Sequence, residues 1–172
     1  MKHTISALVE NHSGVLSRIS GLFSARGFNI DSLTVGETED PTVSRMTIVV
    51  EGDERTLEQV KKQLNKLIDV ITVQDLTKTR FIDRELLLIK VAVESPKDRN
   101  EIIDTAEAMK ADVVDLGSNT VTVEATGETQ KIDRLIEALR QFGIKEIVRT
   151  GRIAMSLDPK GNTQHTPKEE EE

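Results

Sequence analysis

Residues 11–33 read NHSGVLSRISGLFSARGFNIDSL. Apolar residues recur at helical spacing from Val15 to Phe23, and Gly27 is placed to end that helix in the left-handed conformation. A short apolar strand precedes the polar turn, and a second strand follows the helix. The first N–H groups of a helix have no partner within it, so such a turn can hold a small anion. The run predicts a unit that senses a small carboxylate and does not transform it.

Composition limits the classes of protein to consider. The chain has 172 residues, 37% hydrophobic and 31% charged, which is typical of one ordinary or two small globular domains. Aromatic residues make up only 2%, so the core must be aliphatic, and small aliphatic domains often complete their cores by forming oligomers. A net charge of -7 and the lack of aromatics for base stacking argue against nucleic-acid binding.

The absence of cysteine excludes disulfides, thiolate metal sites and thiol catalysis, and it fits a reducing cytoplasm. The N-terminal apolar segment is too short for a signal peptide, and no apolar run approaches membrane-spanning length. We therefore expect a cytoplasmic protein with no membrane partner.

The first half of the chain alternates between strand and helix patterns. Strands are predicted at 4–10, at 29–37, around Met46–Val50 and at 70–76. The first helix starts at Gly14. The second is capped by Asp53, and its inner stripe is expected to be Leu57, Val60, Leu64, Leu67 and Ile68. This order, βαββαβ, is that of a ferredoxin-like domain.

The same order returns in the second half. A strand at 85–94 leads to Ser95-Pro96-Lys97-Asp98, which has the cap, proline and carboxylate of a helix start. Strands at about 112–116 and 120–125 flank the turn 117–119, a helix follows, and 144–149 closes the sheet. We predict an α+β protein of two tandem ferredoxin-like domains, at 1–77 and 85–157, joined by a linker at 78–84 and followed by a disordered acidic tail at 158–172.

No set of catalytic residues is apparent. The three histidines have no helical pairing with Asp or Glu that would suggest a metal site. The glycines match no nucleotide-binding fingerprint, and nothing indicates a buried carboxylate pair. His12 lies in the key turn, where it is either an exposed turn residue or a neighbour of a ligand. Arg18 and Arg26 are expected to face solvent.

An α-amino acid would suit the turn at residues 11–16. The N–H groups of Gly14–Leu16 suit its carboxylate, Gly14 lets it come close to the backbone, and the Asn11 amide can bind either charged group. An alternative stays open at this point, in which Asn11 and Ser13 merely cap the helix. Asn29, beside Gly27, can likewise be only a turn residue.

Longer strings carry a resemblance to a known family. Residues 1–76 resemble an ACT domain, a module that binds amino acids at subunit interfaces. More narrowly, the chain is similar to the regulatory small subunits of acetolactate synthase. The matching segments are 10–14, 16–18, 21–24, 26–35, 41–47 and 63–70, with looser agreement at 84–91 and 146–151.

The resemblance implies a protein without activity of its own. It would bind the catalytic large subunit of acetolactate synthase, which uses thiamine diphosphate, magnesium and FAD to condense pyruvate with a second 2-oxo acid. It would raise that enzyme's activity and confer feedback inhibition by valine, and no cofactor is expected in this chain. Valine would lie between the ACT domains of a homodimer. One chain would contribute Asn11 with the backbone of Gly14, Val15 and Leu16, and its neighbour Asn29 and Ile30.

One departure from the family pattern bears on this site. The family often follows the second strand with a small residue and proline, whereas this chain has Gly36-Glu37, which can alter the edge of the pocket.

Two other functions are compatible with the same fold. A free-standing amino-acid-sensing ACT protein would share the turn but not the strings after residue 40. An acylphosphatase-like hydrolase needs an arginine in the turn, and residues 10–14 contain none. The ferredoxin-like fold alone does not decide between them.

Overall fold

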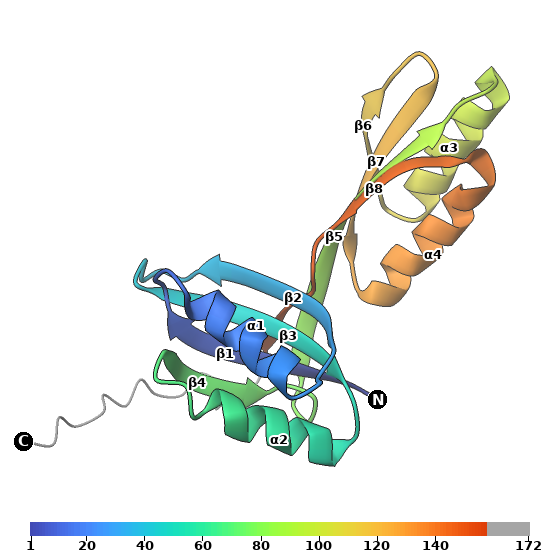
Figure 1. The fold of residues 1–172 in the computed structure, drawn as a ribbon. Coiled ribbons are helices and arrows are strands. Elements are labelled where there is room, and N and C mark those ends of the chain that lie inside the picture. The colour runs from blue at the N-terminus through green and yellow to red at the C-terminus, as the bar shows by residue number, and fades with distance from the viewer. Residues whose placement is uncertain (158–172) are drawn as a thin grey trace, which may run out of the picture. The chain divides into compact units, whose positions relative to one another are not determined.

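The computed structural model describes residues 1–157, which form two compact units (Figure 1). The first comprises residues 1–82 together with 154–157, and the second residues 83–153. Along the chain, the elements begin with β1 (Lys2–Glu10), α1 (Val15–Ala25), β2 (Ile30–Glu37), β3 (Val43–Glu51), α2 (Glu54–Leu64) and β4 (Val70–Asp75). Those that follow are β5 (Phe81–Ala92), α3 (Pro96–Ala108), β6 (Asp112–Leu116), β7 (Thr120–Gly127), α4 (Thr129–Leu139), the 3-10 turn η1 (Arg140–Phe142), β8 (Ile144–Arg149) and β9 (Ile153–Ser156).

Both units have the strand order of a ferredoxin-like sheet. In the first the order is β2-β3-β1-β4, and β1 lies antiparallel to both β3 and β4. In the second it is β6-β7-β5-β8, which is the same arrangement one repeat later. The predicted α+β fold with two tandem βαββαβ units is therefore confirmed.

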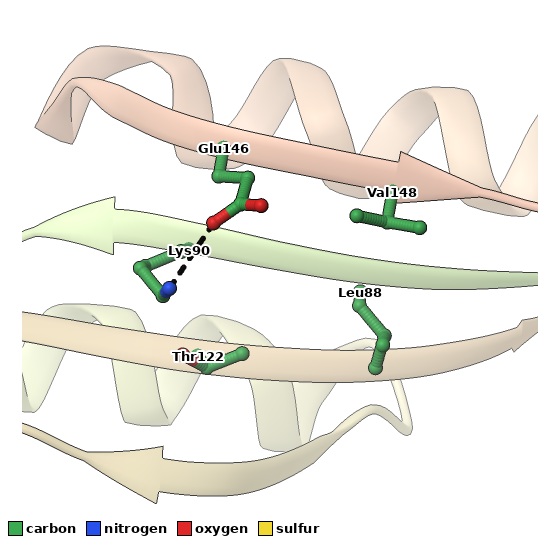
Figure 2. A pocket seen from close by; sticks show the side chains of 5 residues that line it. All are labelled: Leu88, Lys90, Thr122, Glu146 and Val148. Atoms are coloured by element: carbon green, nitrogen blue, oxygen red, sulfur yellow. Dashed lines mark hydrogen bonds and ion pairs between the residues drawn. The ribbon is translucent and has the colours of Figure 1, made fainter.

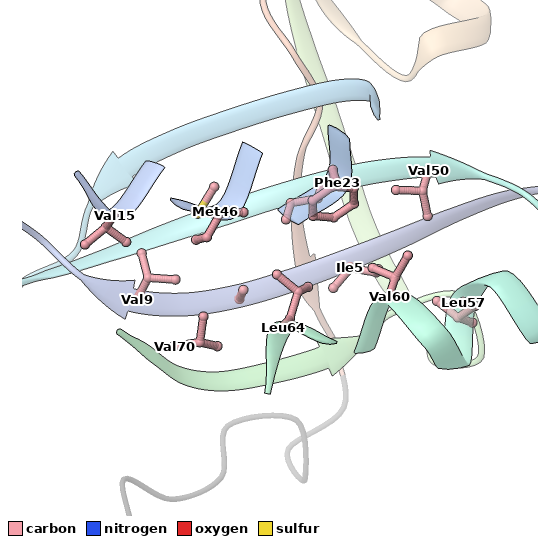
Figure 3. Close-up of a cluster of buried hydrophobic side chains, with 13 residues drawn as sticks. Ile5, Val9, Val15, Phe23, Met46, Val50, Leu57, Val60, Leu64 and Val70 are labelled. Carbon is pink, nitrogen blue, oxygen red and sulfur yellow. The ribbon is translucent and has the colours of Figure 1, made fainter. Parts of the chain in front are cut away.

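The aliphatic core of the first unit lies between its helices and its sheet (Figure 3). The predicted helix stripes are largely confirmed: the fully or nearly fully buried side chains include Val15, Ile19, Phe23, Leu57, Val60 and Leu64. Two predicted apolar positions are exposed instead, Leu16 by 47% and Ile68 by 83%. Helix α2 ends at Leu64, so Ile68 falls outside the helical repeat that would have turned it inward.

Helix α1 ends as its glycine predicts. Gly27 has a φ of 68°, and its N–H donates to the Ser24 carbonyl while that of Phe28 donates to Phe23. This pair of bonds is a Schellman motif, which satisfies the last carbonyls of a helix. The rings of Phe23 and Phe28 meet edge to face with centroids 6.3 Å apart, and this contact anchors the chain as it enters β2.

Helix α3 of the second unit starts with the predicted capping box. The Ser95 hydroxyl accepts from the Asp98 N–H at 3.2 Å, and the Asp98 carboxylate accepts from the Ser95 N–H at 2.9 Å. The core below α3 and α4 is aliphatic and includes Leu87, Ile89, Ile102, Val121, Val123, Ile132 and Leu135.

The boundary between the units differs from the predicted one. Strand β5 begins at Phe81, so the last four residues of the expected linker 78–84 are strand. Their pairing partner is β9, a strand that periodicity did not predict, and the Leu157 N–H donates to the Arg80 carbonyl at 2.8 Å. Residues 154–157 belong with the first unit and not with the expected second domain, 85–157. The predicted acidic tail, 158–172, lies outside the described residues.

Within residues 1–157, no helix is both long enough and apolar enough to cross a lipid bilayer.

Candidate functional site

The turn before α1 has backbone donors without partners. Gly14 precedes the helix with a φ of 90°, and no side chain caps the helix. Within the described residues, no hydrogen bond is formed by the N–H groups of Leu16 and Ser17. The alternative in which Asn11 and Ser13 cap α1 is therefore wrong, and the first turn keeps the free donors that a carboxylate would need.

Asn11 instead joins this turn to the β2–β3 connection. Its Nδ2 donates to the Glu37 Oε1 at 3.1 Å and to the Pro41 carbonyl at 2.8 Å. The backbone N–H of Asn11 also donates to the Thr42 carbonyl, at 2.7 Å. Asn11 is exposed, and its side-chain oxygen forms no hydrogen bond within residues 1–157.

Arg18 does not simply face solvent, as the sequence suggested. Its Nε donates to Asp69 Oδ2 at 2.6 Å and its Nη2 to Asp69 Oδ1 at 3.0 Å. The Asp69 side chain is only 6% exposed, and the Asp69 carbonyl accepts from the Glu10 N–H. This bidentate pair lowers the pKa of the Asp69 carboxyl, mainly through the hydrogen bonds from Arg18. It also holds a guanidinium beside Gly14, where an added Cβ would lie 3.2 Å from Arg18 Nη1.

His12 has acceptors at both ring nitrogens. Nδ1 lies 3.1 Å from the Ser13 carbonyl, while Nε2 lies 3.1 Å from a Glu10 carboxylate oxygen and 3.2 Å from Asp69 Oδ1. Only the doubly protonated ring can donate from both nitrogens. The pKa of His12 is accordingly raised, first by the Ser13 carbonyl and then by Glu10 and Asp69.

The ligand-type atoms of Glu10, His12 and Asp69 lie within 4.8 Å of one another, a grouping the sequence did not predict. Both Asp69 oxygens already accept from Arg18, so a metal ion would have to displace a guanidinium. The Arg18 guanidinium lies beside Gly14 at the start of α1, and the pKa of the His12 ring in the same turn is raised. The turn therefore favours an anion over a cation.

The other predicted site residues lie at two ends of α1. Val15 is buried and Leu16 is 47% exposed at the start of the helix. Asn29 is exposed and Ile30 is half-buried beyond its end. An 11-residue helix is roughly 16 Å long, so one chain does not bring Asn29 to Gly14. Joining the two halves of the predicted site needs a second copy.

The second unit has a pocket of its own on the sheet face away from α3 and α4. Figure 2 shows its lining residues, which are Leu88, Lys90, Thr122, Glu146 and Val148. Lys90 Nζ and Glu146 form an exposed ion pair at 3.1 Å. None of the predicted site residues lies here.

Comparison with known proteins assigns both halves of the chain. The model of the "AHAS small subunit-like ACT domain" matches residues 5–72, and that of the "Small subunit of acetolactate synthase" matches residues 84–158. The chain belongs to the acetolactate synthase small-subunit family.

Individual relatives agree with this assignment. The "Probable acetolactate synthase small subunit" of Methanothermobacter thermautotrophicus is 53% identical, over 90% of this chain and 92% of the relative. The "Acetolactate synthase small subunit" of Mycobacterium leprae is 49% identical, over 92% and 94%. The crystal structure of the small subunit from Thermotoga maritima superposes with a TM-score of 0.83 at 39% identity, covering 91% of this chain and 97% of that one.

The sequence did not predict the pairing of Arg18 with Asp69. It indicated Glu37 as a residue at the edge of the pocket, but not as the hydrogen-bond partner of Asn11. Arg18 and Asp69 both lie in strings that carried the family resemblance, so a signal was present. Their contact was not readable, because residues 51 positions apart follow no shared period.

Proposed function

We propose that this small-subunit family member is the regulatory subunit of acetolactate synthase, which activates the catalytic large subunit and makes it sensitive to valine. The observation that carries the proposal is the match of both halves, in order, to the two modules of acetolactate synthase small subunits. The ACT half supplies an effector site, and the second half is specific to this family.

Valine would bind between the ACT domains of a homodimer. Its carboxylate would meet the free N–H groups at the start of α1, near Arg18 and His12. Asn11, Gly14, Val15 and Leu16 would come from one chain and Asn29 and Ile30 from the other. The separation of these residues along α1 supports a site completed by a second copy.

The condensation of 2-oxo acids would take place on the large subunit, which would hold thiamine diphosphate, magnesium and FAD. The alternative, a free-standing amino-acid sensor, would not explain why residues 84–158 match the acetolactate synthase small subunit.

The test is reconstitution. The full chain is mixed with the catalytic subunit of its own host, and acetolactate formation from pyruvate is measured with and without valine. We expect no product from the chain alone, a rise in activity when it is added, and inhibition of the complex by valine. A catalytic subunit unaffected by a stoichiometric amount of the chain would contradict the proposal.

A further inference from the structure

The Asn11 amide is held in one orientation. Its Nδ2 donates to the Glu37 carboxylate at 3.1 Å and to the Pro41 carbonyl at 2.8 Å. Neither partner carries a proton, so turning the amide over would set its oxygen against two other oxygens. The donor end of Asn11 is therefore occupied, and only its oxygen is left to meet a ligand.

We infer that Glu37 makes the effector site selective for ligands that carry an ammonium group and excludes the corresponding 2-oxo acids. This inference rests on the proposed function. By fixing the amide, Glu37 and Pro41 leave an acceptor, which an ammonium satisfies as a donor. The carbonyl of a 2-oxo acid has only lone pairs to offer to that oxygen, so the contact becomes repulsive.

The charges around the turn follow the same direction. Glu37 brings a negative charge within one hydrogen bond of Asn11. Gly14 lies three residues after Asn11 in the chain, and the Arg18 guanidinium lies beside it. A zwitterionic amino acid can place its ammonium toward Glu37 and its carboxylate toward Arg18 and the helix start. A 2-oxo acid has the same carboxylate but no ammonium group, so it lacks the attraction to Glu37.

Such selectivity would suit the expected partner. The catalytic subunit would work on 2-oxo acids, whose carboxylates could enter any site that recognised only an anion. A site that also requires an ammonium stays free of substrate and responds to the amino-acid end product.

The experiment is calorimetric titration of the full chain with L-valine, 3-methyl-2-oxobutanoate and 3-methylbutanoate, which share one branched side chain. For the unmodified chain we expect valine to bind and the two analogues to bind at least about a hundredfold more weakly, because the fixed acceptor would be left without a donor.

Two substitutions and one matched control test the role of Glu37. Glu37→Lys should weaken valine binding by about tenfold or more and narrow its advantage over the 2-oxo acid, since it replaces an anionic acceptor with a cation. Glu37→Gln keeps an acceptor for Asn11 but removes the charge. Its preference for valine over the 2-oxo acid should lie between those of the unmodified chain and Glu37→Lys. Glu39→Lys makes the same charge change on an exposed residue with no hydrogen bond or ion pair in the described structure, and should leave the ratio within about twofold. Circular dichroism checks that each variant is folded.

The outcomes separate the two proposals. If the unmodified chain binds the 2-oxo acid as well as valine, or if Glu37→Lys and Glu37→Gln both leave the ratio unchanged, the inference is wrong while valine regulation stands. If the unmodified chain binds no valine and valine does not inhibit the reconstituted enzyme, the valine-sensing part of the proposed function fails and the inference fails with it.

Discussion

Arg18 in α1 and Asp69 before β4 form a bidentate ion pair, with donor–acceptor distances of 2.6 and 3.0 Å. The pair links the helix whose first turn is the candidate effector site to the strand beside β1. Asp69 also reaches His12 and, through its carbonyl, the Glu10 N–H. One buried residue, Asp69, thus connects three segments around the turn through its carboxylate and its carbonyl, and we expect it to set the turn's geometry.

Asp69→Asn should destabilise the first unit. The amide nitrogen would face the donors of Arg18, and we expect a loss of about 1–2 kcal/mol, less than for a fully buried pair because Arg18 is half exposed. Urea unfolding followed by far-UV circular dichroism measures it, since the chain has no Trp or Tyr. Glu137→Gln is the control, because its pair with Arg140 is exposed on both sides and should cost less than about 0.5 kcal/mol. If Asp69→Asn lowers the free energy of unfolding no more than the exposed-pair control Glu137→Gln does, the prediction is wrong.

His12 should make stability depend on pH. Its pKa is raised above the usual 6.5, so its contribution is complete below 6.5 and is lost as the pH rises through the raised value. The difference in free energy of unfolding between the parent and His12→Gln should therefore be largest below pH 6.5 and shrink as the pH rises above it. An NMR titration of the His12 ring gives the pKa directly, and a value at or below 6.5 would refute this account.

Gly14→Asp should remove valine inhibition without abolishing activation. Its carboxylate would compete for the N–H groups that the effector's carboxylate needs. The φ of 90° strains any L residue here, by about 1–2 kcal/mol, so a bare loss of binding could reflect strain.

Gly14→Asn supplies the matched control, because it has the same shape and tolerates a positive φ better. We expect similar stability in both variants and a much larger loss of valine binding in Gly14→Asp. Equal binding losses would remove the charge argument.

Asn29→Ala should weaken valine binding and leave folding intact. Asn29 is exposed and forms no hydrogen bond in the described residues, so the stability change should stay within about 0.5 kcal/mol. A lost hydrogen bond to a charged ligand should weaken binding by about 1.5–3 kcal/mol. Calorimetry that finds parental affinity would take Asn29 out of the site.

Ser95→Ala should lower stability and leave valine binding unchanged. It removes the cap of α3 and should cost the second unit about 1 kcal/mol. Valine affinity should not change, because Ser95 lies in the other unit. Reduced valine binding in this variant would mean that the second unit contributes to the site.

Local features of the chain were readable from the sequence alone. The βαββαβ order, the left-handed Gly27 and the capping box at Ser95 depend on contacts between near neighbours, which periodicity and residue type report. Two predictions failed because they depended on more than local pattern. Ile68 was predicted to face inward, and its exposure depends on where α2 ends. Strand β9 was not predicted, because it forms by pairing with β5, a segment far away in the sequence.

The same division holds for the candidate site. The motif strings singled out the residues of the turn and indicated an anion site before the helix, but they left open whether Asn11 and Ser13 cap that helix; the structure shows that no side chain caps it. The tertiary structure decided the state of each side chain. It occupied the donor end of Asn11 with Glu37 and Pro41 and paired Arg18 with Asp69. Hydrogen-bond direction and charge pairing depend on which distant residues become neighbours, and no local pattern encodes that proximity.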